Sequence, residues 1–293
     1  MWVVNNRKIF YAISSLLIIA SAVSLFVWGL NRGIDFTGGT LIEVSYTGER
    51  PTQASIVSAL STIDPSVSVR PSGTTDYIVR MKTLAQEEKP AIAAALGGGT
   101  VKSFDSIGPV LGAEALRKAY LSIVLVILAI VLYITFAFRK VSEPVSSWKY
   151  GLTAVIALAH DVIIPVGAFS ILGHYAGYEV DTLFVTALLV VLGFSVHDTI
   201  VVFDRVRENL HTSQGRETFA QTVGKSISQT FTRSINTSLT TLIALVVLYI
   251  LGGSITQHFT LALIIGIAAG TYSSVFIGSP LLVTLNDWQK KTK

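Results

Sequence analysis

The chain has 293 residues, of which 51% are hydrophobic and only 14% are charged. Soluble domains carry about 25% charged residues, so this composition excludes an ordinary soluble protein. The lack of cysteine excludes disulfides and thiolate metal sites, and a scattered net charge of +4 does not favour nucleic-acid binding.

Six apolar runs are long enough to cross a bilayer, which takes about 20 residues each. They lie near residues 9–30, 118–138, 150–172, 183–203, 235–251 and 259–285. The first run is longer than the apolar core of a signal peptide. We therefore interpret it as an uncleaved membrane anchor.

Lysine and arginine occur before the first run, between the second and third, between the fourth and fifth, and after the sixth. The short loops 173–182 and 252–258, which face the other way, hold neither. Positive charge marks the cytoplasmic side of short loops. We expect both termini in the cytoplasm and residues 31–117 outside it.

The outside segment alternates between strand and helix patterns. A strand, a helix, two strands, a helix and a strand are predicted at residues 40–46, 51–63, 67–72, 76–82, 84–96 and 100–106. Pro51 is expected in the first helical turn. This βαββαβ order predicts an α+β domain of ferredoxin-like type. The segment holds no metal-ligand cluster and no nucleophile–base set, so we expect a binding or lever domain.

The predicted organisation is therefore a first transmembrane helix (1–30), an extracytoplasmic α+β domain (31–117) and a five-helix transmembrane region (118–293). A helix at 110–117 is expected to run directly into the second span. The cytoplasmic loop 204–233 is expected to form one or two amphipathic helices. The whole is a polytopic α-helical membrane protein with six transmembrane helices and one outside domain.

A glycine-rich stretch, GIDFTGGT at residues 33–40, follows the first span. Gly33, Gly38 and Gly39 are expected at positive φ in tight turns. Asp35 is expected to accept hydrogen bonds from turn amides. We interpret this stretch as fixing the exit of the chain from the membrane against the first strand.

Two His-Asp dipeptides lie inside apolar runs: His160-Asp161 in the third and His197-Asp198 in the fourth. Ionisable groups in a bilayer cost about 2.5–3.5 kcal/mol each on insertion scales and usually mark a pathway or relay. The carboxylates could tie helices together, bind a metal across helices with few ligands, or relay protons. An aspartyl intramembrane protease would need glycine-bracketed aspartates, which the chain lacks.

The relay interpretation assigns a role to each ionisable group. Asp198 would carry the proton, and Arg233 would reach inward along its stem as the counter-charge. Asp161, His160 and His197 would support or hydrate the path. Two alternatives stay open: Arg233 as an interfacial anchor, and the hydroxyl-rich run that follows it as a helix-packing face.

The last span carries small residues every fourth position, at Gly266, Gly270, Ser274 and Gly278. Such a stripe permits close helix approach and predicts packing. Pro165 and Pro280 are potential kinks.

Six motifs together resemble one family. They are GIDFTGGT (33–40), SIGPVLGAEAL (106–116), AHDV (159–162), VHDTIVVFDRVREN (196–209, with Thr199, Asp204 and Arg205), RSINTSLTT (233–241, with Asn236) and GTYSSVFIGSPLL (270–282). In this order they resemble the SecF family of bacterial protein-export subunits, over essentially the whole chain.

The resemblance implies one half of a resistance-nodulation-division architecture in the bacterial inner membrane. It implies SecD as the other half, the channel subunits SecY, SecE and SecG, YajC, and an unfolded exported polypeptide as partners. It aligns Asp198 with the intramembrane acidic residue of the family and Arg233 with its basic partner. His197 departs from the asparagine of some relatives, and the length indicates a form not fused to SecD.

The expected activity is proton-driven promotion of late export, without covalent catalysis, metal or cofactor other than protons. The alternatives are a small-molecule exporter half of the same superfamily, a purely structural translocon subunit and, more distantly, an intramembrane hydrolase.

Overall fold

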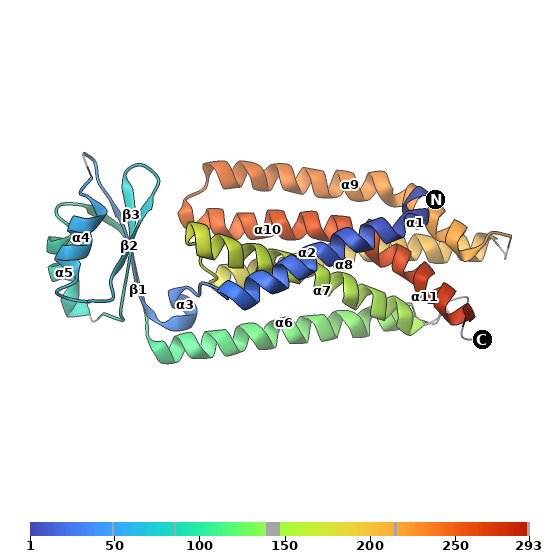
Figure 1. The fold of residues 1–293 in the computed structure, drawn as a ribbon, viewed down its shortest axis with the longest axis horizontal. Coiled ribbons are helices and arrows are strands. Elements are labelled where there is room, and N and C mark those ends of the chain that lie inside the picture. The colour runs from blue at the N-terminus through green and yellow to red at the C-terminus, as the bar shows by residue number, and fades with distance from the viewer. Residues whose placement is uncertain (49, 85, 139–146, 214–215, 292–293) are drawn as a thin grey trace. The chain divides into compact units, whose positions relative to one another are not determined.

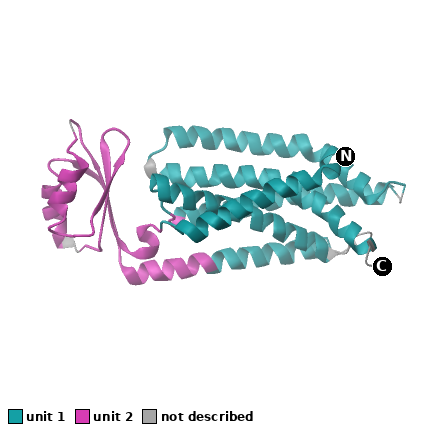
Figure 2. Cartoon of the chain, viewed as in Figure 1, with its two compact units in different colours: residues 1–31, 121–179, 183–293 teal, residues 32–120, 180–182 magenta. Residues whose placement is uncertain are grey.

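A computed structural model describes residues 1–48, 50–84, 86–138, 147–213 and 216–291. The chain forms two compact units (Figure 2). One comprises residues 1–31, 121–179 and 183–293, and the other comprises residues 32–120 and 180–182.

The smaller unit is built on a four-stranded antiparallel sheet with the order β2-β3-β1-β4. Its strands are β1 (Gly39–Ser45), β2 (Ser68–Ser72), β3 (Asp76–Met81) and β4 (Thr100–Ile107). Helices α4 (Gln53–Leu60) and α5 (Lys89–Ala95), the latter after a short 3₁₀ turn at Gln86–Glu88, lie together on one face (Figure 1). This arrangement confirms the predicted βαββαβ order.

The core of this unit lies between the sheet and the two helices. Ile42 and Val44 of the central strand and Val79 of its neighbour are fully buried, because alternate residues of a strand point to one face. Leu60 of α4 and Ile92 of α5 close over them. The alternation seen at residues 40–46 of the sequence thus corresponds to a strand with one buried face.

The start of α4 differs from the prediction. Thr52 is the N-cap, and its hydroxyl accepts a hydrogen bond from the Ser55 amide at 3.3 Å. Pro51 lies before the cap and outside the helix, where its carbonyl accepts from the Tyr77 hydroxyl at 2.8 Å. A threonine that satisfies a free amide is a better helix start than a proline that merely lacks one.

Among the described residues, six helices are long and apolar enough to cross a membrane, and most of their length belongs to the larger unit. They are α2 (Arg7–Trp28, after the short α1, Trp2–Asn5), α6 (Pro109–Ala137), α7 (Ser147–Ala176), α8 (Thr182–Ser213), α9 (Phe219–Leu251) and the last span. The last span joins α10 (Ser254–Ser273), a π-helical segment (Ser274–Gly278) and α11 (Ser279–Lys291). The six predicted spans are confirmed.

Several of these helices extend beyond the predicted spans. Helix α6 is continuous from Pro109, so the expected helix at 110–117 and the second span are one element. Helices α8 and α9 extend through most of the predicted loop 204–233. The helical hydrogen bonds thus continue past the point where the apolar runs end.

The glycine-rich stretch forms one short helix, α3 (Ile34–Thr37), followed by Gly38 and Gly39 at φ of +73° and +129°. The prediction for Gly33 is wrong: its φ is −67°, which any residue adopts, because it serves as the N-cap of α3. A side chain on Gly38 would place Cβ 2.8 Å from Pro109 Cα, and one on Gly39 would lie 2.9 Å from the Met81 carbonyl oxygen.

Replacing Gly38 by alanine is expected to destabilise the smaller unit by about 2 kcal/mol or more. Two penalties add up. Alanine would have to adopt the positive φ of Gly38, which costs about 1–3 kcal/mol in residues other than glycine, and its methyl group would clash with the backbone of Pro109. Hydrogen exchange of the β1, β3 and β4 amides in the purified full chain would measure the loss.

Gly48→Ala is the matched control, because an added Cβ there has open space within 4 Å. Its effect is expected to stay within about 0.5 kcal/mol. If the sheet amides were equally protected from hydrogen exchange in Gly38→Ala and Gly48→Ala, glycine would not be needed at position 38 for the backbone to follow this path.

Candidate functional site

Asp198 is buried in the larger unit, with 2% of its surface exposed. Its carboxylate Oδ2 accepts a long hydrogen bond of 3.4 Å from the Ser238 hydroxyl of α9. The neighbouring His197 is exposed. Successive residues of a helix point about 100° apart, so the dipeptide places one ionisable group inside the bundle and the other outside.

The Ser238 hydroxyl is itself held from the last span. Thr271 of α10 donates to Ser238 Oγ at 2.6 Å, and both side chains are buried. Asp198 is thereby connected through α9 to α10 by two hydroxyl groups.

Arg233 lies on α9, one and a half turns before Ser238, and its side chain is exposed. Among the described contacts, it has no hydrogen bond or ion pair with Asp198, and its guanidinium acts on that carboxylate through space. Its own carbonyl accepts from Thr237 at 3.0 Å. The structure therefore brings Arg233 near the site without joining it to the acid.

Asp161 of α7 is fully buried and is the centre of a second polar cluster. Its Oδ2 accepts hydrogen bonds from Ser195 of α8 and, at 2.8 Å, from Ser273 of α10. Its Oδ1 lies 2.8 Å from Nδ1 of His160. Because a carboxylate only accepts, the imidazole Nδ1 is the donor in that bond.

His160 is 2% exposed, and its ring stacks on Tyr272 with centroids 6.0 Å apart. Its Nε2 atom is buried and has no hydrogen-bond partner within the described part of the chain. The Tyr272 hydroxyl donates to the Phe10 carbonyl at 3.1 Å. This ring pair thus connects α7, α10 and α2.

The two buried aspartates therefore differ in their environment. Three donors saturate Asp161 and tie α7 to α8 and α10. Asp198 accepts one long hydrogen bond and keeps unused acceptor capacity. A saturated buried carboxylate holds helices in place, whereas a poorly saturated one has room to change its protonation state.

Close approach of α10 to α8 brings the clusters together. A Cβ added at Gly266 would lie 2.3 Å from Val191 Cγ2, and one added at Gly270 would lie 3.0 Å from Ser195 Cβ. The prediction that these glycines serve packing is confirmed. The π-helical segment begins directly after Ser273 and ends before Pro280, where Ser279 Oγ donates to the Ser274 carbonyl.

Four hydroxyl residues of the site were missed from the sequence as contacts of the acids: Ser195, Ser238, Thr271 and Ser273. Ser195 lies one turn before Asp198, and the other three belong to motifs that were interpreted only as packing or hydroxyl-rich faces. Spacing alone does not show which of many hydroxyls faces a carboxylate.

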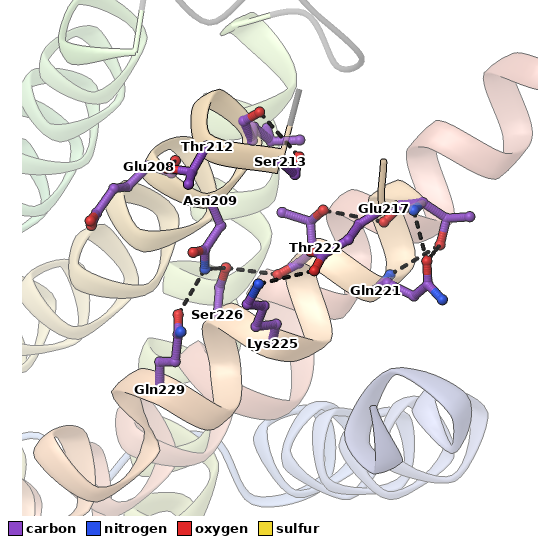
Figure 3. Close-up of polar contacts among 12 residues, drawn as sticks. Glu208, Asn209, Thr212, Ser213, Glu217, Gln221, Thr222, Lys225, Ser226 and Gln229 are labelled. Atoms are coloured by element: carbon purple, nitrogen blue, oxygen red, sulfur yellow. Dashed lines mark hydrogen bonds and ion pairs between the residues drawn. The ribbon is translucent and has the colours of Figure 1, made fainter. Parts of the chain in front are cut away.

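The end of the 196–209 motif lies at the junction of α8 and α9, drawn in Figure 3. Asn209 donates to Ser226 Oγ and to Gln229 Oε1, both at 2.8 Å. Arg205 donates to the same Gln229 atom at 2.7 Å and to Glu208 at 2.6 Å. The bonds from Asn209 and Arg205 to Ser226 and Gln229 hold the two helices together, and none of these contacts reaches Asp198.

The helix start at this junction is also well capped. Thr218 and Gln221 form a capping box, and Lys225 pairs with Glu217 at 2.9 Å (Figure 3). A reciprocal cap satisfies two free amides and fixes the first turn of α9.

The remaining motif residues have local roles. Thr199 is buried beside the last span, 3.9 Å from the position of a Cβ on Gly278. Asp204 is exposed and 3.7 Å from Arg207, and Asn236 is exposed on α9. Asp35 accepts from the backbone amide of Thr182, the first residue of α8, at 2.9 Å and does not bond its own turn.

Within the described residues, no group of three or more His, Cys, Asp or Glu side chains could hold a metal ion. The site consists of carboxylates and hydroxyls in an apolar bundle. Such groups can exchange and pass protons.

Comparison with protein families matches residues 90–288 to the C-terminal region of the protein export membrane protein SecD/SecF, and residues 23–48 to the SecD/SecF GG motif. The second match contains Gly38 and Gly39. The first contains Asp161, Asp198 and their hydroxyl partners.

Curated relatives match over nearly their whole length. The protein translocase subunit SecF of Thermobaculum terrenum is 43% identical over 99% of this chain and 94% of its own. The SecF subunit of Sebaldella termitidis is 36% identical over 99% of this chain and 93% of its own.

Among solved structures, SecDF from Thermus thermophilus, a translocon-associated membrane protein, superimposes with a TM-score of 0.84 at 32% identity. The match covers 98% of this chain but 38% of that one. SecDF in its super-membrane-facing form gives a TM-score of 0.70 at 31% identity.

Proposed function

The chain belongs to the SecD/SecF family of protein export membrane proteins, and on that premise we propose that it is a multi-pass SecF subunit that works with SecD to promote protein export by using a proton gradient. In this proposal Asp198 takes up and releases the coupling proton. The subunit catalyses no covalent step and needs no metal or organic cofactor.

The observation that carries the proposal is the contrast between the two buried aspartates. Asp198 lies inside a membrane-length helix with one long hydrogen bond, while Asp161 is saturated by three donors. A group that changes protonation state needs an environment tolerable in both forms. Exposed Arg233 supplies positive charge without locking Asp198 in one form.

The other parts of the chain have supporting roles in this proposal. The chain lies in the bacterial inner membrane with both termini in the cytoplasm. The ferredoxin-like unit faces the exported, unfolded polypeptide, and SecY, SecE, SecG and YajC are the further partners. The match to 38% of the longer SecDF chain fits a subunit that supplies one half of such an assembly.

The test is export of a preprotein into membrane vesicles that contain the complete translocase, with or without this subunit. We expect an imposed proton gradient to accelerate the late stage of export only when the subunit is present. A protonophore should remove the acceleration, and an equal sodium gradient should not replace it. Acceleration by the gradient in both vesicle types would refute the proposal and favour a purely structural subunit.

A further inference from the structure

The two hydroxyls that connect Asp198 to the last span each face two acceptors. Ser238 Oγ lies 3.4 Å from Asp198 Oδ2 and 2.9 Å from the Ser234 carbonyl one turn earlier. Thr271 Oγ1 lies 2.6 Å from Ser238 Oγ and 2.8 Å from the Ile267 carbonyl. A hydroxyl carries one hydrogen, so each can make only one of its two bonds well at a time.

Which of its two acceptors the Ser238 hydroxyl bonds depends on the protonation state of Asp198. An ionised carboxylate only accepts, so it draws the hydroxyl hydrogen toward itself. A protonated carboxyl is a donor, so its hydrogen points at Ser238 Oγ and the serine hydrogen turns to the Ser234 carbonyl. No proton leaves the hydroxyl in this exchange, because the hydrogen only rotates about the C–O bond.

The same change affects Thr271, because Thr271 donates to Ser238 Oγ, the oxygen that changes from donor to acceptor toward Asp198. When Ser238 Oγ accepts from Asp198, its lone pairs are shared between two donors. The alternative acceptor for Thr271, the Ile267 carbonyl, belongs to its own helix. Such a bond to the carbonyl one turn earlier competes with the helical ladder and often bends a helix.

We propose that Ser238 and Thr271 are positioning residues for Asp198, whose paired hydroxyls carry the change between its two protonation states from α8 through α9 to the last span. This inference rests on the proposed function and adds to it the route by which the proton site acts on α10.

The place where this route meets α10 supports the proposal. Thr271 lies two residues before Ser273, which binds Asp161, and three residues before the π-helical segment. Single π segments inside helices occur frequently at functional sites. The hydroxyl pair therefore acts on the last span next to its irregular turn.

The charged groups around the route are few. His197 lies on the same helix as Asp198, and Arg233 acts from α9 through space. On α7, His160 and Asp161 bind each other, and Asp161 reaches α8 through Ser195. The route through Ser238 and Thr271 contains hydroxyls alone.

The test uses pairs of variants in the full complex. Thr271→Val keeps the shape and removes the hydroxyl, whereas Thr271→Ser keeps the hydroxyl. Ser238→Ala and Ser238→Thr form the second pair. Thr240→Val is the control, because Thr240 is an exposed hydroxyl on α9 that bonds only carbonyls of its own helix.

We expect Thr271→Val and Ser238→Ala to lower gradient-dependent export about fivefold, which corresponds to the loss of one hydrogen bond. Thr271→Ser, Ser238→Thr and the Thr240 control should retain it. Equal losses in Thr271→Val and Thr271→Ser would overturn the proposal, since keeping the hydroxyl would then preserve no part of the gradient response. Unchanged export in Thr271→Val and Ser238→Ala would overturn it as well.

A spectroscopic measurement covers variants that assemble poorly. The infrared C=O stretch of protonated Asp198 is identified in the purified subunit, without its partners, by its absence in Asp198→Asn. We expect the band to move to higher frequency in Ser238→Ala, because the carboxyl loses its partner, and to stay in place in Thr240→Val. A band that stays in place in Ser238→Ala would refute the contact.

The outcomes separate this inference from the proposed function. If the wild-type subunit gives no gradient-dependent acceleration, the function itself fails. If the wild type responds to the gradient and the hydroxyl variants behave as wild type, only the route through Ser238 and Thr271 fails.

Discussion

Replacing Asp198 by asparagine is expected to reduce export to the rate measured without a proton gradient, while export driven by ATP alone continues. The amide fills the same space but cannot gain or lose a proton near neutral pH. Burial leaves this side chain with one hydrogen bond, so the change should disturb the fold little. Vesicle export at a series of imposed gradients would show a flat response.

Asp204→Asn is the matched control. Asp204 lies six residues later on the same helix, but its side chain is exposed, and its interaction with Arg207 spans 3.7 Å. The gradient response of this variant should equal that of the wild type. A preserved gradient response in Asp198→Asn would remove Asp198 from the coupling step and leave the chain as a structural subunit.

Replacing Asp161 by alanine is expected to act on stability first. It removes the acceptor of the Ser195 hydroxyl and of the ring N–H of His160, and it leaves the Ser273 hydroxyl only the Gly270 carbonyl, at 3.2 Å. Breaking a buried charged cluster on one side costs about 3–5 kcal/mol. The thermal unfolding temperature of the purified protein in lipid should fall, and the yield of assembled complex should fall with it.

Two companion variants sharpen this result. Asp161→Asn retains one acceptor oxygen and should cost less, about 1–3 kcal/mol for the unsatisfied donor. Asp287→Ala removes a partly exposed ion pair with Arg7 and should cost less than about 1 kcal/mol. If Asp161→Ala were as stable as the wild type but insensitive to the gradient, Asp161 and not Asp198 would be the exchanging group.

The two aspartates differ in their contacts inside one helix bundle. The acid with three donors ties α7, α8 and α10 together, and the acid with one weak donor is the one that we propose responds to the gradient. The glycines of the last span make this possible, because a larger residue at Gly270 would push α10 away from Ser195.

Much of this molecule follows from the order of its residues. The apolar runs predicted six spans because a bilayer demands about 20 apolar residues per crossing. Alternation at residues 40–46 predicted the first strand of the smaller unit because a strand with one buried face repeats every two residues. The two His-Asp dipeptides stood out because ionisable groups are rare in apolar helices.

The direction in which each side chain points was decided only by the tertiary structure. A span that is apolar all round carries no stripe to show which side meets its neighbours, so Asp198 could not be placed inside and His197 outside from the sequence. Nor could Ser195 and Ser273 be assigned to Asp161, or Ser238 and Thr271 to Asp198. Those contacts arise from the rotation and close approach of packed helices, which glycines far along the chain permit.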